Sequence, residues 1–112
     1  MGVLGWMDVS VSGCDAEGII RELLEAGSRD EVVVLLFLSR QDAVLLSAIQ
    51  RALTGGRYYA SGTWTKSLVY SLIRRGLVRE LNVTIRGKKY RLYTLTDCGI
   101  RVANILGKTF NL

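Results

Sequence analysis

The sequence has 112 residues, of which 49% are hydrophobic and 22% charged, a composition typical of a folded domain and not of a disordered tail. A chain of this length buries about two-thirds of the surface that its unfolded form exposes, so one domain can be stable without crosslinks. It contains no histidine, the commonest general base and neutral metal ligand, and it has no nucleophile-and-base pair or metal-ligand cluster. We therefore expect neither an enzyme nor a cofactor or metal site.

The formal net charge of +5 is unevenly distributed along the chain. Residues 1–56 carry a net charge of −4, whereas residues 57–91 carry +8 and include Glu80 as their single acidic residue. A concentrated positive field attracts polyanions and makes their binding sensitive to salt. The distribution predicts that the basic segment binds an acidic partner.

The sequence predicts neither export nor a membrane span. Residues 1–13 lack the cationic and apolar regions of a signal peptide, and the longest apolar run, 32–38, is far shorter than the ~20 residues of a spanning helix. Cys14 and Cys98 have neither CxxC nor metal-ligand spacing, and we expect them to be reduced thiols, with a disulfide as the alternative. These features together predict a soluble, cytoplasmic protein.

The first predicted helix covers residues 16–26, with Asp15 as its N-cap and Gly27 after its end. Its apolar residues share one face. This face can pack on the rest of the same domain or form a dimer arm, and the sequence leaves both open. Residues 1–13 are either a flexible lead or a docked arm.

Two further helices are predicted before residue 54. Ser28 and Glu31 have the spacing of a capping box at the start of a helix that runs to Leu38, although the β-branched residues 32–34 also favour a strand. Residues 39–42 break the pattern before a helix over 43–53. Its inward residues are Val44, Leu45, Ala48, Ile49 and Ala52. One continuous helix over 29–53 is the alternative.

The segment from residue 63 to residue 96 reads TWTKSLVYSLIRRGLVRELNVTIRGKKYRLYTLT and begins with an amphipathic helix. The inward side of this helix carries Thr65, Leu68, Val69, Leu72 and Ile73, and the outward side carries Thr63, Ser67, Tyr70, Ser71 and Arg74. Gly76 can end the helix in the left-handed conformation, with Leu77 folding back onto its last turn.

Two alternating strands are predicted next, over 77–85 and 89–95. The intervening residues 86–89 can form a tight turn in which Gly87 supplies the positive φ. Because the odd-numbered residues of the first strand are mostly apolar, we expect them to face the core. Thr96 is a candidate N-cap for a last helix over 97–106, which Gly107 ends.

This order resembles the winged helix-turn-helix domain of MarR-like and PadR-like transcriptional regulators. In those families a GL-V step ends the recognition helix and an LT-x-x-G step begins the helix after the wing, and residues 76–78 and 95–99 match these steps. The resemblance covers residues 28–107. It implies an α+β, mostly helical fold: a three-helix core, a two- or three-stranded antiparallel hairpin wing, and flanking N- and C-terminal helices.

A single domain over 1–112 is expected, with 28–95 as the winged-helix core. Residues 1–27 would form an arm and an extra helix, and residues 96–112 a C-terminal helix and tail.

The resemblance also implies sequence-specific binding of double-stranded DNA by a transcriptional regulator, as a homodimer formed through the terminal helices. The recognition helix would lie in the major groove and the wing on the adjacent minor groove or its phosphates. The residues implied for base edges are Thr63, Lys66, Ser67 and Tyr70, those for phosphates are Arg57 and Arg74, and those of the wing are Arg86, Lys88 and Lys89. Arg75 and Arg79 are expected to be solvated. The alternative is a winged-helix module that binds a protein within a larger assembly.

Overall fold

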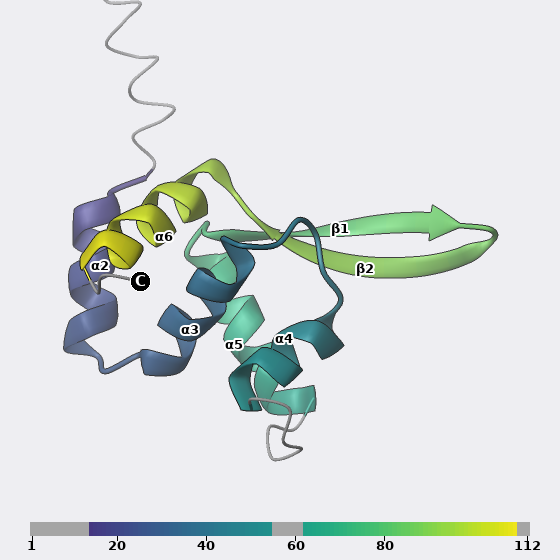
Figure 1. Ribbon diagram of the computed structural model, residues 1–112, viewed down its shortest axis with the longest axis horizontal. Helices are drawn as coiled ribbons and strands as arrows, with labels where there is room; N and C mark the ends of the chain where they lie inside the picture. The colour runs from purple at the N-terminus through teal and green to yellow at the C-terminus, as the bar shows by residue number, and fades with distance from the viewer. Residues whose placement is uncertain (1–13, 55–61, 110–112) are drawn as a thin grey trace, which may run out of the picture.

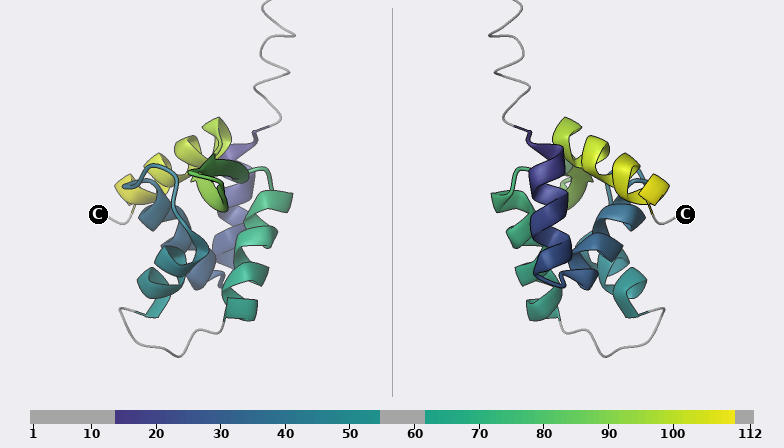
Figure 2. Two further views of the ribbon diagram at one scale, coloured as in Figure 1. Left: turned by 90° about the vertical axis from the view of Figure 1, so that its right-hand side faces the viewer. Right: turned by 90° about the vertical axis from the view of Figure 1, so that its left-hand side faces the viewer.

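The computed structural model describes residues 14–54 and 62–109, which form five helices and one antiparallel hairpin (Figure 1). The elements are α2 (Ala16–Glu25), α3 (Arg29–Leu38), α4 (Leu46–Thr54), α5 (Gly62–Arg74), β1 (Val78–Ile85), β2 (Lys88–Leu95) and α6 (Asp97–Thr109). Helices α2 and α6 lie at the end of the molecule away from the hairpin tip, and the hairpin projects from the body (Figures 1 and 2).

Helices α2 and α3 confirm the first two predicted helices. The Asp15 carboxylate accepts a hydrogen bond from the Gly18 amide at 3.2 Å, and Gly27 has a φ of +67° after the helix end. The capping box predicted for α3 is wrong, because Ser28 makes no side-chain cap bond. Glu31 instead accepts a hydrogen bond from the Ser71 hydroxyl at 3.0 Å. The carboxylate that was expected to cap its own helix therefore joins α3 to α5.

Helix α4 begins at Leu46 and not at the predicted residue 43. The reason is a pair of backbone hydrogen bonds between Val44 and Tyr93, of 3.0 Å and 2.8 Å, which holds Val44 as an isolated bridge on the hairpin. Leu45 is 42% exposed, so its expected inward position is also wrong. Helices α3 and α4 are separate elements, which rules out one continuous helix over 29–53.

Helix α5 ends as predicted. Gly76 has a φ of +79°, its amide donates to the Ile73 carbonyl at 2.9 Å, and the Leu77 amide donates to the Leu72 carbonyl at 3.0 Å. This pair of bonds is the Schellman arrangement, which satisfies carbonyl groups that the helix leaves unpaired. Leu77 is fully buried. The closing turn therefore fixes the direction in which β1 leaves α5.

The β1–β2 hairpin, residues 78–95, is called the wing below. Arg86 and Gly87 have φ values of +51° and +81°, the signature of a two-residue type I′ turn, with Ile85 opposite Lys88. Only the foot of the wing enters the core, through Val78, Tyr93 and Leu95.

The predicted inward face of the hairpin is wrong at this foot. Val78 pairs with Leu95, and Glu80 with Tyr93, so the even-numbered residues of β1 share the face of the buried residues of β2. The odd-numbered Leu81 lies on the other face and is half-buried. The packing of Val78 at the foot decides the face, because the rest of the strand runs beyond the core.

Thr96 caps α6 as predicted. Its hydroxyl oxygen accepts from the Gly99 amide at 3.0 Å and its hydroxyl donates to the Gly76 carbonyl at 2.6 Å. A Cβ at Gly99 would collide with the Leu77 carbonyl, so the helix can approach the end of α5 only because residue 99 is a glycine. The predicted end at Gly107 is wrong, since α6 continues to Thr109.

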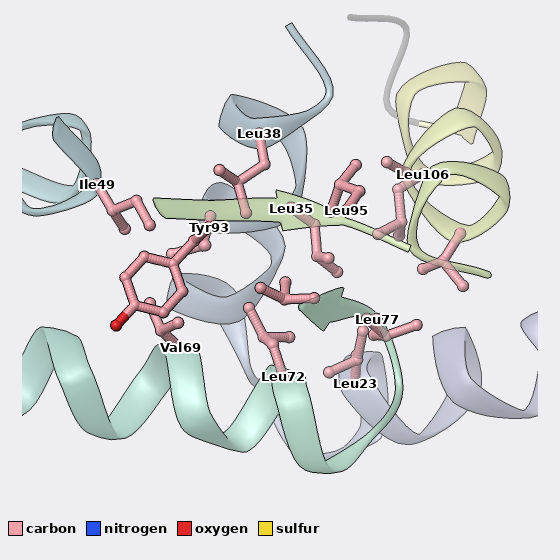
Figure 3. Packing of buried hydrophobic residues seen from close by; sticks show 14 of the residues in the cluster. Leu23, Leu35, Leu38, Ile49, Val69, Leu72, Leu77, Tyr93, Leu95 and Leu106 are labelled. Atoms are coloured by element: carbon pink, nitrogen blue, oxygen red, sulfur yellow. The ribbon is translucent and has the colours of Figure 1, made fainter. Parts of the chain in front are cut away.

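The buried hydrophobic residues form a core cluster to which all the described helices and the foot of the wing contribute. Figure 3 labels Leu23, Leu35, Leu38, Ile49, Val69, Leu72, Leu77, Tyr93, Leu95 and Leu106. Across residues 14–54 and 62–109, the structure contains no helix with the length and apolarity needed to cross a bilayer.

Cys14 and Cys98 form a disulfide, with their Cα atoms 5.3 Å apart. The expectation of reduced thiols is therefore wrong. The bond ties the residue before the N-cap of α2 to the first turn of α6. Disulfides are typical of oxidising compartments and of intracellular proteins from hyperthermophiles, so the cysteines do not support the expected reducing cytoplasm.

Candidate nucleic-acid interface

One face of α5 is exposed because the opposite face is locked into the core. Thr65, Val69 and Leu72 are fully buried, which fixes the rotation of the helix about its axis. Thr63, Lys66 and Ser67 are consequently exposed, and we call these three side chains the α5 ridge. Arg74 is also exposed, about two helical turns beyond Ser67.

Lys66 of the α5 ridge and the wing border a common concave surface. Lys66 lines a surface hollow of about 370 Å³ together with Lys89 and Arg91 of β2. The same hollow is lined by Tyr90 and Tyr93 of the wing and by Leu45, Leu46 and Ser47 at the start of α4. Positive charges from the helix and from the wing therefore lie on the same side of the molecule.

The tip of the wing carries the cations that the sequence assigned to it. Arg86, Lys88 and Lys89 are all exposed. Within the described parts of the chain, none of the three forms an ion pair. No described acidic residue neutralises their charges, which leaves them available to an anionic partner.

Tyr70 is not the free surface residue that the sequence predicted. Its hydroxyl donates to Glu80 Oε1 at 3.4 Å, and the Tyr93 hydroxyl donates to the same oxygen at 3.2 Å. Lys66 Nζ lies 5.6 Å from the centre of the Tyr70 ring, within the range of a cation–π contact. Tyr70 thus supports Lys66 and the foot of the wing, and a base contact by its hydroxyl would require that bond to break.

Tyr93 is almost completely buried, with 3% of its surface exposed, and Figure 3 shows its hydroxyl oxygen at the edge of the core cluster. Burial, followed by the negative charge of Glu80, raises the pKa of Tyr93 to about 12. Both effects disfavour the phenolate. The phenol therefore remains a hydrogen-bond donor to Glu80 at physiological pH.

Arg75 is not a solvated surface charge. It forms ion pairs with Glu22 of α2, at 2.8 Å, and with Glu31 of α3, at 3.6 Å, and 28% of its side chain is exposed. Arg79 is exposed, as predicted. Arg75 therefore has a structural role, holding α2 and α3 against the end of α5, and does not belong to the cationic surface.

Arg91 belongs to the cationic surface but was missing from the predicted contact residues. A signal for it was present, because residues 89, 91 and 93 of one strand share a face. Arg91 Nε also lies 3.8 Å from Glu80 Oε2. The predicted contact residue Arg57 lies outside the described residues.

The three core helices α3, α4 and α5, the strand-like bridge at Val44 and the wing after α5 define a winged helix-turn-helix fold. The chain is similar in structure to ZitR of Lactococcus lactis, solved as a double mutant in its apo form. The TM-score is 0.62 at 16% sequence identity, and the match covers 99% of this chain and 74% of the ZitR chain. This likeness concerns the fold. No protein-family model and no curated protein sequence matches the chain.

Proposed function

We propose that the protein is a transcriptional regulator that binds double-stranded DNA. In this proposal α5 lies in the major groove and the wing lies on the adjacent minor groove or its phosphates. The observation that supports it best is the hollow that Lys66 shares with Lys89 and Arg91. A convex, polyanionic duplex fits a concave surface with cations on both of its sides.

The proposed contacts divide into two kinds. Residues of the α5 ridge face the base edges: the hydroxyls of Thr63 and Ser67 read sequence weakly, whereas Lys66 can meet the acceptors of guanine. The remaining cations bind phosphates and hold the register, and they are Arg57, Arg74, Arg86, Lys88, Lys89 and Arg91. Affinity then depends mainly on the wing, and sequence preference on the ridge.

A homodimer is part of the proposal, because two copies would read two half-sites of an operator. An apolar hollow of about 500 Å³ lies between α2 and α3, lined by Leu23, Leu24, Val32, Val33 and Leu36 among others. Leu24 is 48% exposed there, and Ile100 of the neighbouring α6 is 47% exposed. Apolar surface of this kind, at the end away from the wing tip, suits contact with a second copy.

The salt dependence of binding tests the proposal. If about four of the six proposed phosphate-binding cations neutralise a phosphate in each protomer, the slope of log K against log salt is about −4 for one protomer and about −7 for a dimer. Binding of labelled duplexes, followed by fluorescence anisotropy from low to moderate salt, gives this slope. A slope near zero would contradict groove binding.

Three variants separate the roles. Lys88→Ala combined with Lys89→Ala should weaken binding to all duplexes alike and flatten the slope by roughly 2 per protomer. Lys66→Ala should change the preference among duplex sequences. The matched control removes the two exposed cations of α6, Arg101 and Lys108, and leaves affinity unchanged.

The second candidate is a protein-binding module within a larger assembly. Its candidate contact is Ile85, which is 54% exposed at the wing tip. This candidate predicts weak DNA binding that hardly depends on salt, and loss of partner binding in Ile85→Ser. The same titration therefore distinguishes the two functions.

A further inference from the structure

Glu80 lies where the wing meets α5. Its carboxylate accepts hydrogen bonds from Tyr70 of α5 and from Tyr93 of β2, at 3.4 Å and 3.2 Å, and it pairs with Arg91 of β2 at 3.8 Å. The side chain of Glu80 is 26% exposed, so this contact is partly shielded from solvent. Glu80 is also the one acidic residue between positions 57 and 91. It thus connects the helix to the wing within an otherwise cationic region.

The other contacts that hold the wing to the body also lie at its foot, where Val44 makes two backbone hydrogen bonds with Tyr93. The buried residues of the wing lie at the foot, and both strands are half-buried or exposed beyond Glu80 and Tyr93. From Glu80 to Ile85 the strand extends about 17 Å at about 3.3 Å per residue. A tilt of about 10° at the foot therefore moves the tip by about 3 Å, the length of one hydrogen bond. A small change of angle at the foot therefore displaces Lys88 at the tip.

We propose that Glu80 is a positioning residue that fixes the angle between the wing and α5 by holding the Tyr70 and Tyr93 hydroxyls on a single carboxylate oxygen. Without it, the wing moves as a lever on the body. The consequence for DNA rests on the proposed function: a mobile wing must be ordered on the duplex, which costs binding free energy.

The angle can be measured in the free protein, independently of DNA. Residual dipolar couplings of wing amides in ¹⁵N-labelled wild-type protein should fit the same alignment tensor as those of the helices. In Glu80→Ala the couplings of residues 82–91 should scale down and no longer fit that tensor. Tyr70→Phe combined with Tyr93→Phe should do the same while the carboxylate stays in place. Glu80→Gln keeps an acceptor oxygen for the hydroxyls, and its dipolar couplings should remain close to those of the wild type.

Asn82→Ala is the matched control, since Asn82 is exposed on the same face of β1 and its loss should leave the couplings unchanged. The core amide shifts report whether each variant is folded. A folded Glu80→Ala whose wing still shares the tensor of the body would overturn the proposal. So would a folded tyrosine double variant with an unchanged wing.

Binding to a duplex then links the angle to function. Tyr70→Phe combined with Tyr93→Phe keeps the charge of Glu80 and its ion pair with Arg91, and this variant should bind roughly threefold to tenfold more weakly, because a flexible segment becomes ordered. Lys88→Ala should lower affinity without altering the couplings. If the wing loosens but affinity stays the same, the positioning role stands and the proposed wing contact with DNA fails. If the couplings are unaffected while DNA binding follows the salt slope given above, the positioning role of Glu80 fails and the proposed wing contact with DNA stands.

Discussion

Replacing both Cys14 and Cys98 with serine should lower the free energy of unfolding by several kcal/mol. The disulfide joins residues 84 positions apart in the sequence. In the loop-entropy treatment, a crosslink over that length removes denatured-state entropy worth about 4.5 kcal/mol at 25 °C. Since a folded domain is stable by only about 5–15 kcal/mol in total, this one bond accounts for a large fraction.

Loss of the disulfide should destabilise α2 before the other helices. The disulfide holds the start of this helix to α6, while its remaining attachments are buried residues such as Ile20 and Leu23 and the ion pair between Glu22 and Arg75. Helices α3, α4 and α5 and the foot of the wing contribute buried residues to the core cluster and are not joined by the disulfide. We therefore expect amide exchange in α2 to speed up before exchange in α5.

Thermal unfolding followed by circular dichroism provides the assay. At roughly 4 °C per kcal/mol for a domain near 100 residues, the melting temperature should fall by about 15–20 °C in reductant. The double serine variant should have a melting temperature near that of the reduced wild type, and adding reductant should not change it. Two titratable thiols in the untreated native protein, or a shift under about 3 °C, would refute the reasoning.

Two further substitutions test the packing of α6 and the environment of Tyr93. Gly99→Ala should destabilise the protein by about 1–3 kcal/mol in chemical denaturation, because the added Cβ would meet the Leu77 carbonyl. Gly107→Ala, in open space on the same helix, is the control and should not destabilise the protein. Equal effects of the two substitutions would contradict the contact. The pKa of Tyr93 is raised to about 12 from about 10 for an exposed phenol. The contribution of its protonated hydroxyl to the free energy of unfolding is therefore complete below pH ~10 and is lost as the pH rises towards ~12. The Tyr93→Phe variant should lack this part of the alkaline decline in stability, and parallel pH profiles would argue against the raised pKa.

The features that could be predicted from the sequence depend on neighbouring residues. Gly27 and Gly76 end helices because the left-handed conformation favours glycine, and the Arg86–Gly87 turn follows from the same preference. Thr96 caps α6 through an amide three residues away. The periodicity of α5 placed its buried face correctly, since an amphipathic helix shows its core face in its own residues.

The features that could not be predicted depend on residues far apart in the chain. Val44 lies outside the helix because its backbone forms hydrogen bonds with that of Tyr93. Glu31 does not cap its own helix and instead accepts a hydrogen bond from Ser71 of α5. Alternation along β1 gave the wrong inward face because only its foot is buried. Composition gave no reason to pair the cysteines.

The candidate site shows the same division. Exposure of the wing-tip cations and of the α5 ridge followed from charge and periodicity. The engagement of the Tyr70 hydroxyl could not be predicted in this way, because its hydrogen-bond partner is Glu80 of the wing. Arg91 joins the surface through its strand register with Lys89, which alternation alone could have indicated. Local patterns thus identify the cations, and the fold decides which of them act together.

A titration of the ¹⁵N-labelled protein with a short DNA duplex, followed through its amide shifts, tests the central claim most directly. Binding through α5 and the wing predicts the largest changes at Thr63, Lys66 and Ser67 and at the wing tip, residues 86–89. The amides of α2 should change little. Changes concentrated around Leu24 and the α2–α3 hollow, with the ridge and wing tip unaffected, would contradict the account.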